Sequence, residues 1–138
     1  MAGFTNAAEA ALLDAIFSVL GASGTDLWLG LSTTTPAEDG TGVTEPSGNA
    51  YVRIPIVAAD FAAATGGAPS TKANSGVLSW PAATGAWGTV THVTVHNHLT
   101  AGTVKGSGPI TSQAVVSGNV VSFAIGALVF RLGDGTPT

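Results

Sequence analysis

From Asp26 onward the chain consists of short segments in which apolar and polar residues alternate, and glycines and prolines separate these segments. Successive side chains of a β-strand point to opposite faces, so a period of two predicts strands that bury one face. The clearest examples are residues 27–31, with Trp28 opposite the leucines, and residues 89–96. Seven to eight such short strands indicate a mainly β chain, an antiparallel, jelly-roll-like β-sandwich.

The pattern also predicts where the strands begin and end. We expect strands at about 26–32, 51–58, 74–80 and 89–96, around 104, and at 110–116, 119–123 and 128–132. Pro55 has no main-chain N–H, so the second of these strands should lie at a sheet edge or be bulged. Ser117-Gly118 predicts a tight hairpin between the strands beside it. The segments 33–49 and 61–72 are rich in loop-forming residues, and a loop as long as the first usually makes contacts.

One helix is expected before the strands, at about residues 6–20. Asn6 followed by Glu9 fits a capping pair, and Gly21 and Gly24 would end the helix. Apolar side chains at helical spacing form one broad face, which should dock on the sheet. We therefore expect a single domain over residues 1–138, made of the helix (6–20), the β-sandwich (26–132) and a loose tail (133–138).

The chain is poor in charge. Only 9% of its residues are charged, whereas about 25% is typical of soluble domains. Since the cores of protein interfaces are depleted in charge, we expect neighbouring protein to hide much of the surface. The alternative is a hydroxyl-rich surface of the kind found on many extracellular β-proteins.

Several classes of function are disfavoured by the same composition. The four basic residues are scattered, at Arg53, Lys72, Lys105 and Arg131, and the net charge is −4, so we expect no nucleic-acid partner. No apolar stretch is long enough to span a membrane, and the N-terminus lacks the features of a secretory signal. We therefore expect no membrane partner and assembly in a cytoplasm. There is no cysteine, so disulfides are excluded.

All three histidines, His92, His96 and His98, fall within seven positions. On one strand these positions share a face, and imidazole pairs bind zinc or nickel. We favour a polar outer face over a metal site, because no carboxylate lies nearby in sequence to orient the rings. A third interpretation is a pH-sensitive interface, formed where copies of this strand meet.

No catalytic motif is found, and we expect neither an enzyme nor a cofactor. Adjacent Glu38 and Asp39 match no calcium-loop spacing, so a solvated turn is favoured there. Trp28, Trp80 and Trp87 are candidates for an interface or for stacking on sugars. We favour core or interface anchors over sugar binding.

The sequence resembles a family of small bacteriophage virion proteins usually labelled phage tail fibre proteins. The stretches that carry this resemblance are residues 28–36 (WLGLSTTTP), 45–48 (EPSG), 51–53 (YVR), 74–76 (NSG), 81–85 (PAATG), 87–92 (WGTVTH), 107–109 (SGP), 121–123 (VSF) and 126–128 (GAL). The similarity extends from about the helix to Leu132 and implies a place in the virion. It transfers no catalytic residue. The sequence departs from the family pattern after His92, so the resemblance assigns no role to the histidine cluster.

Together these observations predict a non-enzymatic structural protein of a phage virion, assembled in the host cytoplasm. We expect a homo-oligomer, with a trimer suggested by analogy with other viral sandwiches. Its further partners would be capsid or tail proteins, since both head decoration and a tail or fibre-associated subunit fit the sequence. The alternative is a module that binds host surface glycans during adsorption.

Overall fold

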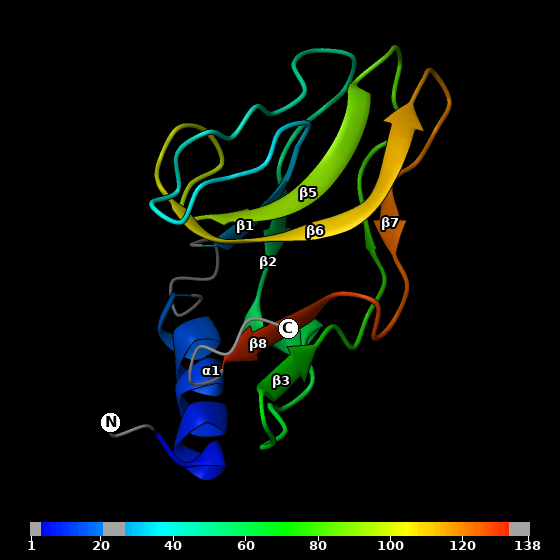
Figure 1. Ribbon diagram of the computed structural model, residues 1–138. Coiled ribbons are helices and arrows are strands. Elements are labelled where there is room, and N and C mark those ends of the chain that lie inside the picture. The colour runs from blue at the N-terminus through cyan, green and yellow to red at the C-terminus, as the bar shows by residue number, and fades with distance from the viewer. Residues whose placement is uncertain (1–3, 21–26, 133–138) are drawn as a thin grey trace. The chain divides into compact units, whose positions relative to one another are not determined.

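The computed structural model describes residues 4–20 and 27–132 (Figure 1). Over these residues the chain forms an α-helix, α1 (Asn6–Leu20), a short 3-10 helix, η1 (Ala58–Asp60), and eight strands. The strands are β1 (Leu27–Ser32), β2 (Ile54–Ile56), β3 (Ser70–Ala73), β4 (Leu78–Ser79), β5 (Gly88–His96), β6 (Val104–Val115), β7 (Ser122–Phe123) and β8 (Val129–Leu132). They form open antiparallel sheets of the kind used in sandwiches, so the mainly β fold class with one N-terminal helix is confirmed.

The chain divides into two compact units, and both are built from separated segments. Unit 1 comprises residues 1–24, 57–78 and 123–138, and unit 2 comprises residues 25–56 and 79–122. The expectation of a single domain therefore stays a prediction. The expected tail at 133–138 and the helix-ending Gly21 and Gly24 lie outside the described residues.

Unit 2 contains a four-stranded sheet in the order β2-β1-β5-β6. The leucines of β1 are buried, whereas Trp28 on its other face is half-buried, as the alternation predicted. Leu29 pairs with Val95, and Gly30 pairs with Thr94. Figure 1 shows β6 running along the outer side of β5, where it ends the sheet. Pro55 lies in β2 at the opposite edge, which confirms the position expected for a residue without an N–H.

The prediction that the strands on either side of Ser117-Gly118 form a hairpin is wrong, although the chain does turn there. Asn119 N–H donates to the Val116 carbonyl at 3.0 Å, and Gly118 has a φ of 87°. However, β6 is one continuous strand that pairs with β5, where two shorter strands were expected. The following segment pairs elsewhere, because Trp80 N–H donates to the Val121 carbonyl at 2.9 Å and β7 pairs with β4.

Other strand limits also differ from those expected. The strands at 51–58 and 74–80 shorten to β2 and β4. The main chain of Asn74 pairs elsewhere, because its N–H donates to the Leu128 carbonyl at 3.1 Å and its carbonyl accepts from Gly126 N–H at 2.8 Å. The loop at 61–72 contains the start of β3, which pairs with β8. The alternation of apolar and polar residues did not predict β3, because its sequence, Ser-Thr-Lys-Ala, buries the polar residues Ser70 and Lys72.

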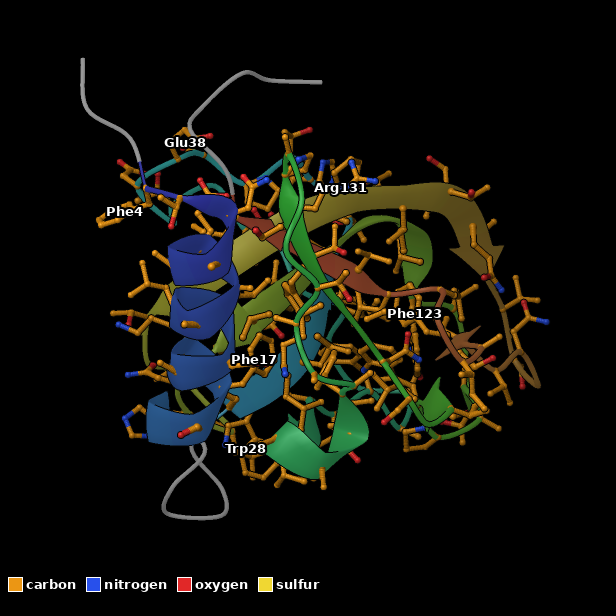
Figure 2. The ribbon with its side chains drawn as sticks, turned by 90° about the horizontal axis from the view of Figure 1, so that it is seen from below. Phe4, Phe17, Trp28, Glu38, Phe123 and Arg131 are labelled. Carbon is orange, nitrogen blue, oxygen red and sulfur yellow. The ribbon has the colours of Figure 1, made fainter. Side chains whose placement is uncertain are left out.

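Unit 1 is organised by α1, which packs on β3, β8 and η1. Glu9, Leu13 and Phe17 lie four residues apart and form the buried face of the helix. The Phe17 ring lies 4.7 Å from that of Phe61 and 5.0 Å from that of Phe130, and Figure 2 shows it pointing inward from the helix. The apolar face expected to dock on strands is therefore present.

The helix begins as predicted, but Thr5 caps it instead of Asn6. Ala8 N–H donates to Thr5 Oγ1 at 3.3 Å, and Glu9 N–H donates to the Thr5 carbonyl at 2.9 Å. The Glu9 side chain turns inward, where it accepts a hydrogen bond from Ser70 Oγ at 3.3 Å. No helix in the described segments combines the length and apolar character needed to cross a bilayer.

Candidate functional site

The three histidines occupy different environments. His96 is the last residue of β5 and is only 2% exposed. His92 is half-buried on the same strand, and its Nδ1 lies 2.9 Å from Thr91 Oγ1. His98 is exposed beyond the end of the strand. His92 and His96 pair with β1 in one uninterrupted register, from Ser32↔His92 to Trp28↔His96, so both lie on the same face of β5. The extra residues at the two register shifts between β5 and β6 belong to β6.

A buried polar cluster surrounds His96. Its members are Glu45, Tyr51, Arg53, Thr94 and His96, and all belong to unit 2. His96 Nε2 shares a hydrogen bond with Thr94 Oγ1 at 2.8 Å and lies 4.0 Å from Glu45 Oε1. The cluster occupies the space above Gly30, which pairs with Thr94.

Gly30 is required by this arrangement. A Cβ atom at this position would lie 2.8 Å from Glu45 Oε1, 2.8 Å from Thr94 Oγ1 and 3.0 Å from His96 Nε2. Real Cβ atoms do not approach oxygen atoms so closely, so any side chain here would displace the polar groups. The glycine in the middle of β1 therefore makes room for the cluster.

The centre of the cluster is an ion pair between Glu45 and Arg53. Arg53 Nε donates to both carboxylate oxygens at 2.9 and 3.1 Å, and Nη2 donates to Oε2 at 2.5 Å. The side chains are 22% and 8% exposed, respectively. The Tyr51 hydroxyl donates to Glu45 Oε1 at 2.7 Å and accepts a hydrogen bond from Leu31 N–H at 2.9 Å. The carboxylate is therefore held by three donors on two side chains.

These contacts shift the pKa values of the cluster. Burial acts to raise the pKa of Glu45, but hydrogen bonds from Arg53 and Tyr51 and the Arg53 charge hold it below its ordinary value. Burial raises the pKa of the Tyr51 phenol, and the hydrogen bond to Glu45 adds to the effect. Burial and the charge of Arg53 lower the pKa of His96, and Glu45 only partly opposes them. At neutral pH the cluster thus contains one anion, one cation and a neutral imidazole.

Arg53 also holds the loop that follows β5. Its Nη1 donates to the carbonyls of His98 and Ala101 at 2.7 and 2.8 Å. Within the loop, Thr103 N–H donates to Asn97 Oδ1 at 2.7 Å. We call residues 97–103 the Arg53-bound loop. It carries the exposed side chains of His98 and Leu99, so a buried guanidinium positions an exposed loop.

The tryptophans divide into two buried residues and one half-buried residue. Trp80 is 2% exposed and Trp87 is 4% exposed, so neither ring has a face open to a sugar. Trp87 Nε1 donates to the Asn49 carbonyl at 2.9 Å, and its ring meets the Tyr51 ring edge-on at 5.3 Å. Trp87 therefore supports the segment that carries Tyr51 and Arg53. Trp28 is half-buried on β1.

Unit 1 contains a second ion pair, between Asp14 of α1 and Lys72 of β3. Lys72 Nζ donates to Asp14 Oδ1 at 2.5 Å and to the Ala62 carbonyl at 2.8 Å, and it lies 5.6 Å from the centre of the Phe17 ring. Its side chain is 5% exposed. The hydrogen bond from Lys72, together with one from Ala64 N–H, lowers the pKa of Asp14. The pair fastens the helix to the strand that it covers.

Across residues 4–20 and 27–132, no three side chains among His, Asp and Glu come together to hold a metal ion. Glu38 and Asp39 are exposed, and Asp39 accepts hydrogen bonds from Thr41 in a local turn.

The sequence alone did not identify the buried polar cluster. One available signal was the stretch from Glu45 to Arg53, which places a glutamate, a tyrosine and an arginine within nine positions of a chain that has few charges. This stretch contributes to the family resemblance, but local patterns do not show that Glu45 pairs with Tyr51 and Arg53. The fold supplied Thr94 and His96, which no local pattern links to Glu45.

Comparison with known proteins places the chain in one family. No curated protein matches it. A family model, described as Podophage GP4 fiber I protein gp80, matches residues 3–131 of the 138. This match covers α1, strands β1 to β7 and most of β8, and it confirms the resemblance to phage tail fibre proteins. The chain belongs to the podophage GP4 fiber I protein gp80 family.

Proposed function

We propose that this protein is a non-enzymatic structural component of a phage virion, built into the tail fibre or a part adjoining it. The description of its family as a fiber protein supports the fibre over a head-decoration role. The proposed partners are copies of the same chain and neighbouring tail proteins. The contacts would be made by uncharged surface.

The observation that carries this proposal is the distribution of charge. Ten charged residues lie in the described segments, and only four of them are exposed: Glu38, Asp39, Lys105 and Arg131. Both remaining basic residues, Arg53 and Lys72, are buried in ion pairs. The surface is therefore poorer in charge than the composition indicates, which is a property of surfaces that other protein covers.

Exposed apolar side chains support the same conclusion. On α1, Leu12 and Ile16 are 40% and 43% exposed, one helical turn apart, and Phe4 is exposed just before the helix. The two carboxylates of the helix are both engaged in unit 1, Glu9 with Ser70 and Asp14 with Lys72. A helix that is apolar on its outer side as well is typical of buried helices. We propose this outer face for association with further copies, with three copies expected by analogy with other viral sandwiches.

The oligomeric state tests this part of the proposal. Light scattering on purified protein should give a mass of three chains at micromolar concentration. Ile16→Glu should lower the mass toward one chain, because a carboxylate would be buried in the interface. Ser18→Glu is the matched control, since Ser18 is an exposed polar residue of the same helix. A monomer at all concentrations would contradict self-association.

The place in the particle requires a separate experiment. Gold-labelled antibodies against the purified chain should mark the tail of intact particles in electron micrographs. Labelling of the capsid alone would favour head decoration instead, and particles without label would contradict a structural role. Glycan binding is not favoured by the described residues, because Trp80 and Trp87 are core residues and only Trp28 is partly accessible.

A further inference from the structure

His96 lies where one proton could affect both the ion pair and the loop beside it. The ring is buried, and it immediately precedes the Arg53-bound loop. Its Nε2 faces Glu45 Oε1 at 4.0 Å, and the same oxygen accepts hydrogen bonds from Arg53 Nε and the Tyr51 hydroxyl. The imidazole and the guanidinium are therefore neighbours of one carboxylate.

The groups around the ring leave little to compensate a positive charge. On β1 the residue paired with His96 is Trp28, and Gly30 lies next to the ring. On β6 the paired residue is the apolar Val104. Thr94 contributes a neutral hydroxyl. Among the described residues, the charged groups that act on His96 are Glu45 and Arg53, with the Tyr51 phenol linked through Glu45.

We propose that proton uptake by His96 releases the Arg53-bound loop, so that residues 97–103 open in acid while the sheet of unit 2 stays folded. An imidazolium would attract Glu45 and repel Arg53, and both effects weaken the bidentate pair. Arg53 then loses the carboxylate that fixes its guanidinium. The same guanidinium supplies the two hydrogen bonds to the loop carbonyls of His98 and Ala101.

The sign of the effect follows from the direction of the His96 pKa shift. Burial first and Arg53 second lower this pKa below the ordinary value of 6.5 in the closed form. In the open form Arg53 is no longer held beside Glu45 and the ring, so one of the two causes is removed and the pKa returns toward that value. The open form therefore binds the proton more tightly, and the closed form loses stability as the pH falls through about 6.5.

Native-state hydrogen exchange at pH 7.5 and pH 5.0, corrected for intrinsic rates, tests this proposal. The amides of Asn97 and Thr103, which are hydrogen-bonded within the loop, should lose protection at pH 5.0 relative to pH 7.5. Amides of Val93 and Val95 in β5 should keep their protection. His96→Gln should remove the pH dependence, because glutamine does not titrate.

His98→Gln is the matched control, since His98 is exposed within the same loop and its replacement should leave the loss unchanged. An equal loss of protection at β5 and the loop would show global unfolding and overturn the proposal. A pH dependence that persists in His96→Gln would also overturn it. If His96→Gln fails to fold, NMR titration of the wild-type protein tests the proposal instead. The His96 ring must then titrate with the same midpoint as the loop amides.

Discussion

Replacing Glu45 by glutamine removes the negative charge of the buried polar cluster and changes the size of the side chain very little. The amide oxygen can still accept the hydrogen bond from the Tyr51 hydroxyl, which is 2.7 Å from Oε1. The amide group cannot accept both of the Arg53 donors that reach Oε2, because its second polar atom is itself a donor. The substitution therefore measures the contribution of the Glu45 charge and of its bidentate hydrogen bonds, with side-chain size held constant.

The expected cost is large because Arg53 cannot reach water easily. Its side chain is 8% exposed, and that of Glu45 is 22% exposed. Removing one partner of a buried ion pair costs about 3–5 kcal/mol, since the other charge stays desolvated. The two hydrogen bonds from Nη1 to loop carbonyls reduce this cost, so we expect a loss at the lower end, about 3 kcal/mol. Urea denaturation at pH 7.5, followed by circular dichroism, measures it.

Glu38→Gln is the matched control, because Glu38 is an exposed glutamate in the preceding loop, and its replacement should change stability by less than about 0.5 kcal/mol. The double variant Glu45→Gln/Arg53→Met should recover part of the loss, since it removes both buried charges. A loss below about 1 kcal/mol for Glu45→Gln would refute the reasoning, because it would give the pair the energy of a solvated surface pair.

Two further substitutions test the packing of each unit. Gly30→Ala places a methyl group 2.8 Å from Glu45 Oε1 and should lower the unfolding free energy by about 1–3 kcal/mol, whereas Gly106→Ala on β6 meets no atom within 4 Å and should cost less than about 1 kcal/mol. Phe17→Ala should cost about 3–5 kcal/mol by emptying the aromatic cluster of unit 1, and Phe4→Ala, at an exposed position, should cost less than about 0.5 kcal/mol. Urea denaturation measures all four, and equal losses within either pair would contradict the packing described.

Local patterns in the sequence predicted the elements that repeat regularly. The helix begins and ends at the expected residues, and β1 has the expected alternation because Leu27, Leu29 and Leu31 bury one face. Strand pairing was harder to predict. Ser117-Gly118 forms a turn, but the strand after it pairs with β4, because β6 already pairs with β5. A turn sequence specifies local backbone geometry and leaves the choice of partner strand to tertiary contacts.

For the histidines, local patterns predicted the position on a strand but not the surroundings of each side chain. Their spacing on a regular strand predicted a shared face, and the pairing of β5 with β1 keeps His92 and His96 on one face. Their surroundings still differ, because His96 is buried, His92 is half-buried and His98 lies beyond the end of the strand. The composition predicted a surface poor in charge, and the structure increases this effect by burying Arg53 and Lys72. Which charges would be buried could not be predicted, because their partners lie 8 and 58 positions away in sequence.

Unit 1 joins segments that are far apart in the sequence, since α1 precedes all the strands and β8 follows the others, with Phe17 against Phe130. During synthesis the helix leaves the ribosome long before its final strand exists, so its apolar face waits uncovered while more than a hundred residues are added. A nascent chain that stops before β8 cannot place Phe130 against Phe17, and this face of α1 then stays uncovered.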